Sequence, residues 1–362
     1  MTFAHLGDYS DWVAEAARQL RPAPRPPTRA LIRAAIGFGD DTGIPADVRV
    51  ASRWERDGVH GEEVSWSVGF GPRTSAWVLR PAAAAGRRLP GVVALHCHSG
   101  LRRYGKEKVA DGPGEVPAAV SRLRDEVYSG RAYANVLARR GFVVLVHDVF
   151  TWGSRRFAVE SMPSRLRAAA TAGYDAVCAD HEALVAKYCA VLGTSLAGVV
   201  AREDRAALAY LRSRPDVDPG RVGAVGLSGG GARAALLQAT ADHLDAAVVV
   251  GMMSTMRGLL DRHVDEHTWM FFPPGLAALC DWPVLAASRA PSPLLVQYNR
   301  RDPLFDPRGM DDADALIRTC YGSSDGYTGE FYDGRHVFDA AMQESAFDWL
   351  ASVLSPPPAV RG

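Results

Sequence analysis

The sequence has no surplus of charge of either sign. Lys and Arg together number 41 among 362 residues, Asp and Glu also number 41, and the formal net charge is therefore zero. Proteins that bind nucleic acid depend on a basic surplus to neutralise phosphates. We therefore expect no nucleic-acid partner and a small, weakly charged substrate instead.

Cysteine is scarce and shows no pairing pattern. Its number is odd and no CxxC pair occurs, so neither a disulfide framework nor a structural zinc site is expected. Buried free thiols in a reducing compartment are the favoured interpretation. The five cysteines are Cys97, Cys178, Cys189, Cys280 and Cys320.

Long hydrophobic runs are also missing. Nowhere do about 18 consecutive apolar residues occur, which is the length that a membrane span needs. The N-terminus has no basic head followed by an apolar run, so a secretory signal is not expected either. These absences predict a cytoplasmic protein without a membrane partner, and they leave open whether it forms a homo-oligomer.

The beginning of the chain differs in pattern from the rest. Residues 1–45 combine a short amphipathic helix with a proline-rich connector at 21–28, and we expect them to form an arm laid over the main body. Three alternating runs follow, and they predict antiparallel strands at the edge of a sheet. These runs span residues 48–56, 62–70 and 75–81.

From residue 90 onward, apolar runs typical of buried strands alternate with helix-like segments. This rhythm predicts an α/β domain over residues 46–355, with a mostly parallel central sheet and helices on both faces. Segments 151–193 and 252–290 break the rhythm, and we expect them to be helical cap or lid insertions over the carboxyl ends of the strands. The predicted strands span residues 90–98, 142–148, 222–227, 246–251, 293–299 and 329–334.

A glycine-rich turn follows the apolar run at 222–227. Residues 226–230 match the pattern G-x-S-x-G around Ser228. In a nucleophile elbow the glycines permit a tight turn, and the serine adopts a strained backbone conformation that lifts its hydroxyl above the sheet. Glycine is common in this chain, so the pattern alone is weak evidence. The strand before it and the helix after it favour a nucleophile over a turn without chemistry.

A serine nucleophile needs a base to take its proton and a carboxylate to orient that base. Asp302 follows the predicted strand at 293–299, and His336 follows the last predicted strand. Both therefore lie at strand ends, in the order serine, acid, base. Asp306, further into the same loop, is the alternative acid. The competing interpretations are a capping or ion-paired aspartate and a surface histidine.

Acyl transfer places negative charge on the carbonyl oxygen, and one amide aimed at that oxygen contributes about 3–4 kcal/mol. One predicted donor is the amide of Gly229, directly after the nucleophile. The second is expected from the loop after the first parallel strand, where we favour His98 and place Cys97 second.

Aromatic residues of the two insertions are candidates for lining the substrate pocket, although core packing explains such residues at least as often. These candidates are Trp152, His267, Trp269 and Phe271.

Three segments together resemble the dienelactone hydrolase and acetyl xylan esterase branch of the α/β-hydrolases. They are residues 195–234, with SRPDVDPGRVG leading into the elbow, residues 290–306, and residues 334–350, with H-x-F after the last strand. Residues 95–108, LHCHSGLRRYGKEK, resemble the oxyanion loop of that family. The resemblance implies an α/β-hydrolase fold and cleavage of a carboxylic ester of a small acyl group.

Two positions depart from the family pattern. Cys97 stands where many relatives carry glycine, and its side chain would narrow the site. Ser228 stands where dienelactone hydrolases proper carry a cysteine nucleophile, which argues against dienelactone as the substrate.

Rival functions are a zinc hydrolase and a non-catalytic binding protein that reuses the fold. Residues 263–267 match the zinc pattern H-x-x-E-H, in which His263 and His267 would share a helix face beside Glu266. His96 and His98 would add a second pair on a strand.

The triad itself also serves peptidases, thioesterases and lactonases. Our prediction is a serine-dependent esterase that acts through an acyl-enzyme and needs neither a metal nor an organic cofactor.

Overall fold

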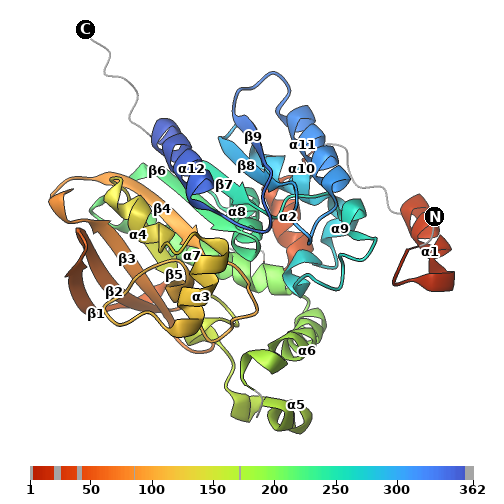
Figure 1. The fold of residues 1–362 in the computed structure, drawn as a ribbon, viewed down its shortest axis with the longest axis horizontal. Helices are drawn as coiled ribbons and strands as arrows, with labels where there is room; N and C mark the ends of the chain where they lie inside the picture. The colour runs from red at the N-terminus through yellow and green to blue at the C-terminus, as the bar shows by residue number, and fades with distance from the viewer. Residues whose placement is uncertain (1–2, 20–25, 39–42, 85, 171–172, 355–362) are drawn as a thin grey trace.

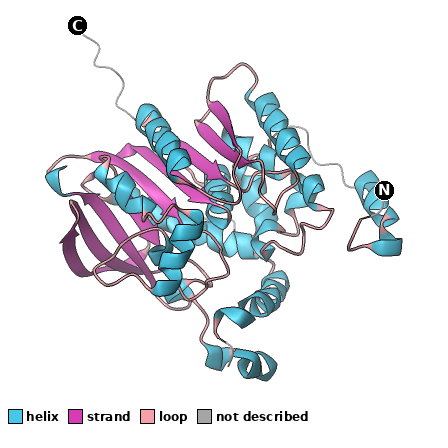
Figure 2. Ribbon diagram, viewed as in Figure 1, coloured by secondary structure: helices cyan, strands magenta, loops and turns pink. Residues whose placement is uncertain are grey.

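The computed structural model describes residues 3–19, 26–38, 43–84, 86–170 and 173–354. At its centre lies one nine-stranded sheet in the order β1-β2-β3-β5-β4-β6-β7-β8-β9 (Figures 1 and 2). The strands are β1 Ala46–Arg56, β2 Val59–Ser67, β3 Thr74–Pro81, β4 Leu89–Leu95, β5 Val143–His147, β6 Val217–Leu227, β7 Ala246–Val250, β8 Leu294–Asn299 and β9 Tyr327–Tyr332.

The sheet has an antiparallel edge and a parallel body. β1, β2 and β3 pair antiparallel with one another, and β3 pairs antiparallel with β5. The pairs from β5–β4 through β8–β9 are parallel. The predicted edge strands and the mostly parallel sheet are confirmed. One boundary differs in a way that matters for the site: β4 ends at Leu95, so His96, Cys97 and His98 lie in the loop after it.

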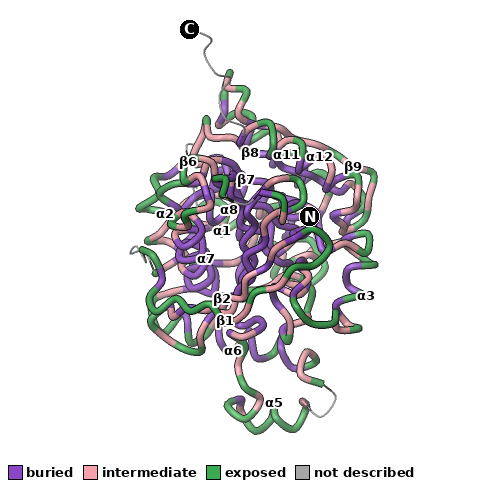
Figure 3. The backbone as a smooth tube through the Cα atoms, turned by 90° about the vertical axis from the view of Figure 1, so that its left-hand side faces the viewer, coloured by how far each residue is buried: buried purple, intermediate pink, exposed green. Residues whose placement is uncertain are grey.

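Helices cover both faces of the sheet, as predicted. Side chains of β4 alternate between these faces: Val93 and Leu95 pack on one, Val92 and Ala94 on the other. Because both faces are apolar, the strand appears in the sequence as a continuous apolar run. Figure 3 shows the buried backbone gathered in the middle of the molecule. One face carries α2 Arg29–Ile36, α7 Leu196–Ser213, α8 Gly229–Thr240, α10 Trp282–Ala286 and α11 Pro307–Tyr321; the other carries α3 Ala118–Val127, α4 Tyr133–Arg139 and α12 Ala340–Val353.

The two segments that break the strand–helix rhythm are built of short helices. Residues 151–193 contain α5 (Ser164–Ala169) and α6 (Cys178–Val191), which project from the body at the lower edge of Figure 1. Residues 252–290 contain α9 (Leu276–Leu279) and α10. No single helix among the described residues is long and apolar enough to cross a membrane, and only two sharply bent helix pairs reach that length and composition together.

Of the α-helices described within residues 1–45, one is packed on the body and the other is exposed. α2 packs on α7, α8 and α9 with Ile32 and Ile36 buried. The Ser195 hydroxyl donates to the Ile36 carbonyl at 2.6 Å, which ties the end of α2 to the start of α7. Helix α1 (Asp11–Gln19) has no buried residue and lies apart from the body in Figure 1. The arm therefore packs on the body mainly through α2, with one further hydrogen bond from the Ala4 amide to Asp261 at 3.2 Å.

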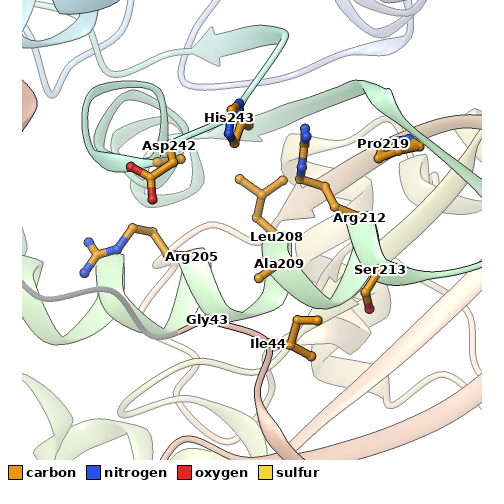
Figure 4. Close-up of a pocket in the computed structure, with 11 residues that line it drawn as sticks. Gly43, Ile44, Arg205, Leu208, Ala209, Arg212, Ser213, Pro219, Asp242 and His243 are labelled. Carbon is orange, nitrogen blue, oxygen red and sulfur yellow. The ribbon is translucent and has the colours of Figure 1, made fainter.

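A cavity of about 330 Å³ lies against α7, lined by Leu208 and Arg212 of that helix and by Ile44 and His243 (Figure 4). Its described lining residues include none of the predicted catalytic residues, so this hollow is separate from the site described below.

Two neighbouring positions test whether α2 belongs to the folded body. Ile32 is fully buried, whereas the Leu31 side chain is 53% exposed. We expect Ile32→Ala to lower the free energy of unfolding by about 2–5 kcal/mol, because it removes buried methyl groups and leaves a cavity. Leu31→Ala should change it by less than about 0.5 kcal/mol. Urea denaturation measures both, and equal losses would contradict this packing.

Candidate active site

Ser228 lies in the turn between β6 and α8. Its backbone has φ 58° and ψ −120°, a conformation that side-chain-bearing residues seldom adopt. Its amide donates to the Val250 carbonyl at the end of β7 at 2.8 Å. This is the strained strand-to-helix turn that a nucleophile elbow requires.

The glycines beside Ser228 are required by close backbone contacts. A Cβ placed on Gly226 would lie 2.4 Å from the carbonyl carbon of Gly230. A Cβ on Gly230 would lie 2.2 Å from the Leu95 carbonyl oxygen at the end of β4. The absence of side chains lets the start of α8 press against the loop that follows β4.

The contact between the start of α8 and the loop after β4 also brings the predicted oxyanion donors together. A Cβ on Gly229 would lie 2.9 Å from the amide nitrogen of His98. Across the described part of the chain, no hydrogen bond has the His98 amide as its donor. The Gly229 amide belongs to the first turn of α8, where amides have no partner within the helix. Two unpartnered amides thus lie side by side next to Ser228.

The geometry favours His98 over Cys97 as the second donor. The His96 carbonyl accepts a hydrogen bond from Arg233 of α8 at 3.4 Å. Since the N–H of a trans peptide points opposite to its C=O, the Cys97 amide is turned away from α8. The His98 amide is turned toward it.

The predicted acid and base are hydrogen-bonded to each other. His336 Nδ1 lies 2.6 Å from Asp302 Oδ2, and the Asp302 side chain is only 1% exposed. The other carboxylate oxygen of Asp302 accepts from the Leu304 amide at 3.0 Å. Asp306, the alternative acid, instead caps α11 by accepting from the Arg308 amide at 2.8 Å. The structure thus pairs His336 with Asp302.

The loops that carry the acid and the base are joined by further hydrogen bonds. The Asn299 side-chain amide donates to the Val337 carbonyl at 2.7 Å, and the Arg301 amide donates to the Gly334 carbonyl at 2.9 Å. Beyond them the fully buried Phe338 anchors the His336 loop in the core. The ends of β8 and β9 therefore act as one rigid support for the acid–base pair.

His336 lies beside the strand that receives the Ser228 amide. A Cβ on Gly251 would lie 3.9 Å from the His336 ring, and Gly251 directly follows Val250, the acceptor of the Ser228 amide. Within the described residues, no hydrogen bond joins Ser228 to His336. Proton transfer requires the two side chains to come within about 2.6–3.2 Å, and such contacts often tighten only when substrate binds.

His267 fastens the second insertion to the acid loop. Its ring packs between Phe271 and Phe305 at centroid distances of 4.8 and 4.7 Å, and its Nε2 lies 3.1 Å from the Leu304 carbonyl oxygen. Burial lowers the pKa of His267 to about 4. The ring is therefore neutral at pH 7, and Nε2–H donates to Leu304.

The other predicted pocket residues differ widely in exposure. Trp269 is 50% exposed and offers a free aromatic surface, whereas Phe271 is buried. Trp152 is also buried, with the Arg102 guanidinium 3.7 Å from its ring centroid and the His98 ring edge-on to it. Trp152 thus packs against His98 of the oxyanion loop.

The zinc pattern does not form the predicted helix. Residues 260–266 form turns, His263 faces Glu266 at 3.5 Å, and His267 is engaged with Leu304. His96 and His98, predicted on a strand, lie in a loop beyond it. No group of three or more His, Cys, Asp or Glu residues is placed to hold a metal ion in the described ranges. The interpretation of the pattern as a shared helix face is wrong.

A buried ion pair that the sequence analysis missed connects the insertions to the oxyanion loop. Glu182 of α6 pairs with Arg102, and both side chains are nearly inaccessible. Glu182 also accepts from the Trp269 amide at 2.7 Å and from the Thr268 hydroxyl, while His98 Nε2 lies 3.3 Å away. The cluster of basic residues after the oxyanion loop was the only local signal, because Glu182 is distant in sequence.

The titration of His267 generates a stability prediction. Between pH 6.5 and 4 the unfolded chain binds a proton at this residue that the folded protein does not, so stability falls as pH decreases through this range. We expect His267→Gln to make the free energy of unfolding less dependent on pH there, by at most about 3 kcal/mol. Urea unfolding at pH 7 and pH 5 measures the difference. An unchanged slope in His267→Gln would refute the assignment.

Comparison with known proteins gives the family. The model of the dienelactone hydrolase family matches residues 129–317, which include Ser228 and Asp302 and end before His336. A curated relative, the candidate hydrolase YtaP of Bacillus subtilis (strain 168), is 23% identical over 286 residues, or 78% of this chain and 84% of that protein.

Solved structures share the fold at low sequence identity. A candidate acetyl xylan esterase of Bacteroides fragilis has a TM-score of 0.70 at 16% identity and covers 97% of this chain and 95% of its own. A glucuronoyl esterase from Solibacter usitatus has a TM-score of 0.62 at 15% identity, with 98% and 95% covered. Acetyl xylan esterase 1 from Thermoanaerobacterium sp. has a TM-score of 0.55 at 14% identity, with 94% and 98% covered. With its α/β-hydrolase fold and a family match over more than half of its length, the chain belongs to the dienelactone hydrolase family.

Proposed function

We propose that this protein is a serine-dependent esterase that cleaves the carboxylic ester of a small acyl group through an acyl-enzyme intermediate. The observation that carries the proposal is the 2.6 Å hydrogen bond between His336 and Asp302, formed beside the strained turn of Ser228. A histidine held by a buried carboxylate next to a strained serine is the arrangement that activates a hydroxyl.

Each residue has one task in the proposed reaction. Asp302 accepts from Nδ1–H of His336, so Nε2 carries the lone pair that takes the Ser228 proton as the hydroxyl attacks the ester carbonyl. The amides of Gly229 and His98 stabilise the oxyanion. The imidazolium returns its proton to the departing alcohol, and a water molecule then releases the acid by the same steps, with His336 again as the base.

Ester chemistry is preferred to the peptidase, thioesterase and lactonase reactions that the same residues could perform. The structural relatives are esterases by name, acting on acetyl xylan or glucuronoyl esters. The acetyl xylan esterase names support a short acyl group and a carbohydrate alcohol, whereas in a glucuronoyl ester the sugar is the acid part. Trp269 is half exposed and lies two residues after His267 in the chain, and its ring is the aromatic surface on which such an alcohol would stack. A panel of acetylated sugars and simple acetates, with amide and thioester analogues of matched acyl length and a simple lactone, separates the four reactions.

Removal of the nucleophile is the direct test of the mechanism. We expect Ser228→Ala to lower kcat for nitrophenyl acetate by at least about 10⁴-fold, since the remaining groups provide only weak catalysis. A fluorophosphonate should label the wild-type protein at Ser228, as located by mass spectrometry, and should not label the variant. Full activity in Ser228→Ala would refute the proposal.

The acid assignment has a matched pair of variants. Asp302→Asn should lower kcat about 10³–10⁴-fold, because the amide no longer holds the correct tautomer of His336. Asp306→Asn should stay within about threefold of wild type, since an asparagine oxygen still caps α11. Initial rates at saturating substrate measure both. The reverse order of effects would assign the acid to Asp306.

A further inference from the structure

Lys108 is a fully buried lysine that the proposed mechanism leaves without a task. It ends the short helical turn Lys106–Lys108 and has no exposed surface. Its Nζ donates to the carbonyl oxygens of Cys97 at 3.0 Å and His98 at 2.9 Å. Both acceptors belong to the oxyanion loop.

The peptide that joins Cys97 to His98 connects Lys108 to the oxyanion site. In a trans peptide the C=O and N–H bonds point in opposite directions. With the Cys97 oxygen held at Lys108, the His98 N–H points the other way, toward Gly229, whose Cβ position is 2.9 Å from that nitrogen. The position of the ammonium group therefore fixes the direction of the oxyanion donor.

The two buried lysines of this turn are partnered differently. Lys106 forms ion pairs with Glu107 and Asp148, both at about 3 Å. In the part of the chain that the structure describes, no ion pair includes Lys108. A buried charge without a carboxylate is costly, and here the loop carbonyls compensate it. A cation at one end of a peptide also polarises the N–H at the other end, which strengthens that donor.

We propose that Lys108 is a positioning residue that holds and polarises the Cys97–His98 peptide, so that the His98 amide is ready to stabilise the oxyanion. This inference rests on the proposed function, because it assigns a task in the same acyl transfer. It also explains how a loop with a cysteine in place of the family's glycine presents a usable amide.

The charge of Lys108 changes within an accessible pH range. Burial lowers the pKa of Lys108 to about 7, so the group is protonated below this pH and neutral above it. A neutral amine still donates, but hydrogen bonds from a charged donor are about twice as strong. We expect kcat to fall severalfold between pH 6.5 and 9 as the charge is lost. The titratable and charged groups that face Lys108 are His96, Cys97, His98, Arg102, Glu107 and Asp175.

The central experiment compares Lys108→Met with Lys106→Met in the full-length protein. Methionine keeps the length of the side chain and removes the donors. For Lys108→Met we expect kcat for nitrophenyl acetate to fall about 10–100-fold with KM within about threefold, because the oxyanion exists only after attack. Lys106→Met should lower the melting temperature and keep kcat within about threefold.

A second measurement follows formation of the tetrahedral adduct itself. When Ser228 attacks a fluorophosphonate, an O–P bond forms, fluoride leaves, the serine proton passes to His336, and the phosphoryl oxygen occupies the oxyanion site. The rate of this labelling should fall in Lys108→Met by about the same factor as kcat. The decline above pH 7 should be present in wild type and absent from the variant.

The outcomes separate the two proposals. A folded Lys108→Met with wild-type kcat and labelling rate, alongside an inactive Ser228→Ala, would overturn the role of Lys108 and leave the esterase mechanism standing. Activity in Ser228→Ala would overturn both. If Lys108→Met does not fold, Lys108→Gln decides, because it also removes the charge: a folded Lys108→Gln with wild-type kcat and labelling rate overturns the inference.

Discussion

The candidate site depends on the close approach between the start of α8 and the loop after β4. A side chain at Gly230 would collide with the Leu95 carbonyl oxygen at the end of β4, so this approach exists only because Gly230 has none, and a side chain at Gly226 would collide with Gly230 inside the turn. This approach forces Ser228 into its strained conformation and places Gly229 against the amide of His98. The proposed nucleophile and the proposed oxyanion donors therefore lie together because of one packing contact at the ends of β4 and β6, which are adjacent parallel strands of the sheet.

Buried cations complete what the glycines begin. Arg233 holds the His96 carbonyl, and Lys108 holds those of Cys97 and His98, so three successive carbonyls of the oxyanion loop point at positive charge. Burying such groups costs several kcal/mol each unless their donors are satisfied, and Arg233 meets this condition through Asp204. A loop without regular secondary structure thus becomes rigid, which is what electrostatic preorganisation demands.

Local sequence patterns predicted the strands, the elbow and the acid and base loops, because each depends on residues close together in the chain. A glycine-rich turn between an apolar run and a helix identifies Ser228, and the rule that sites lie at strand ends locates Asp302 and His336. Local patterns failed where tertiary contacts decide. The helix expected at 263–267 is a turn, because the ring of His267 packs between aromatic residues of two separate segments. Lys108 lies in the segment that resembles an oxyanion loop, but its task depends on partners that it acquires only in the folded chain, and the same holds for Glu182, which no local pattern marks.

The ion pair of Glu182 with Arg102 joins both insertions to the loop that carries the proposed oxyanion donor. Glu182 receives the Trp269 amide of one insertion, is itself carried by the other, and lies beside His98 of the oxyanion loop. In the proposed mechanism, a substrate that displaces Trp269 would therefore disturb the surroundings of His98, the proposed oxyanion donor. Separating the buried ion pair is costly. An alcohol that fits poorly would therefore displace His98 and weaken stabilisation of the transition state of the reaction. If the insertions select the substrate, their specificity would then appear in kcat as well as in KM, because both insertions and the loop of His98 contact one carboxylate.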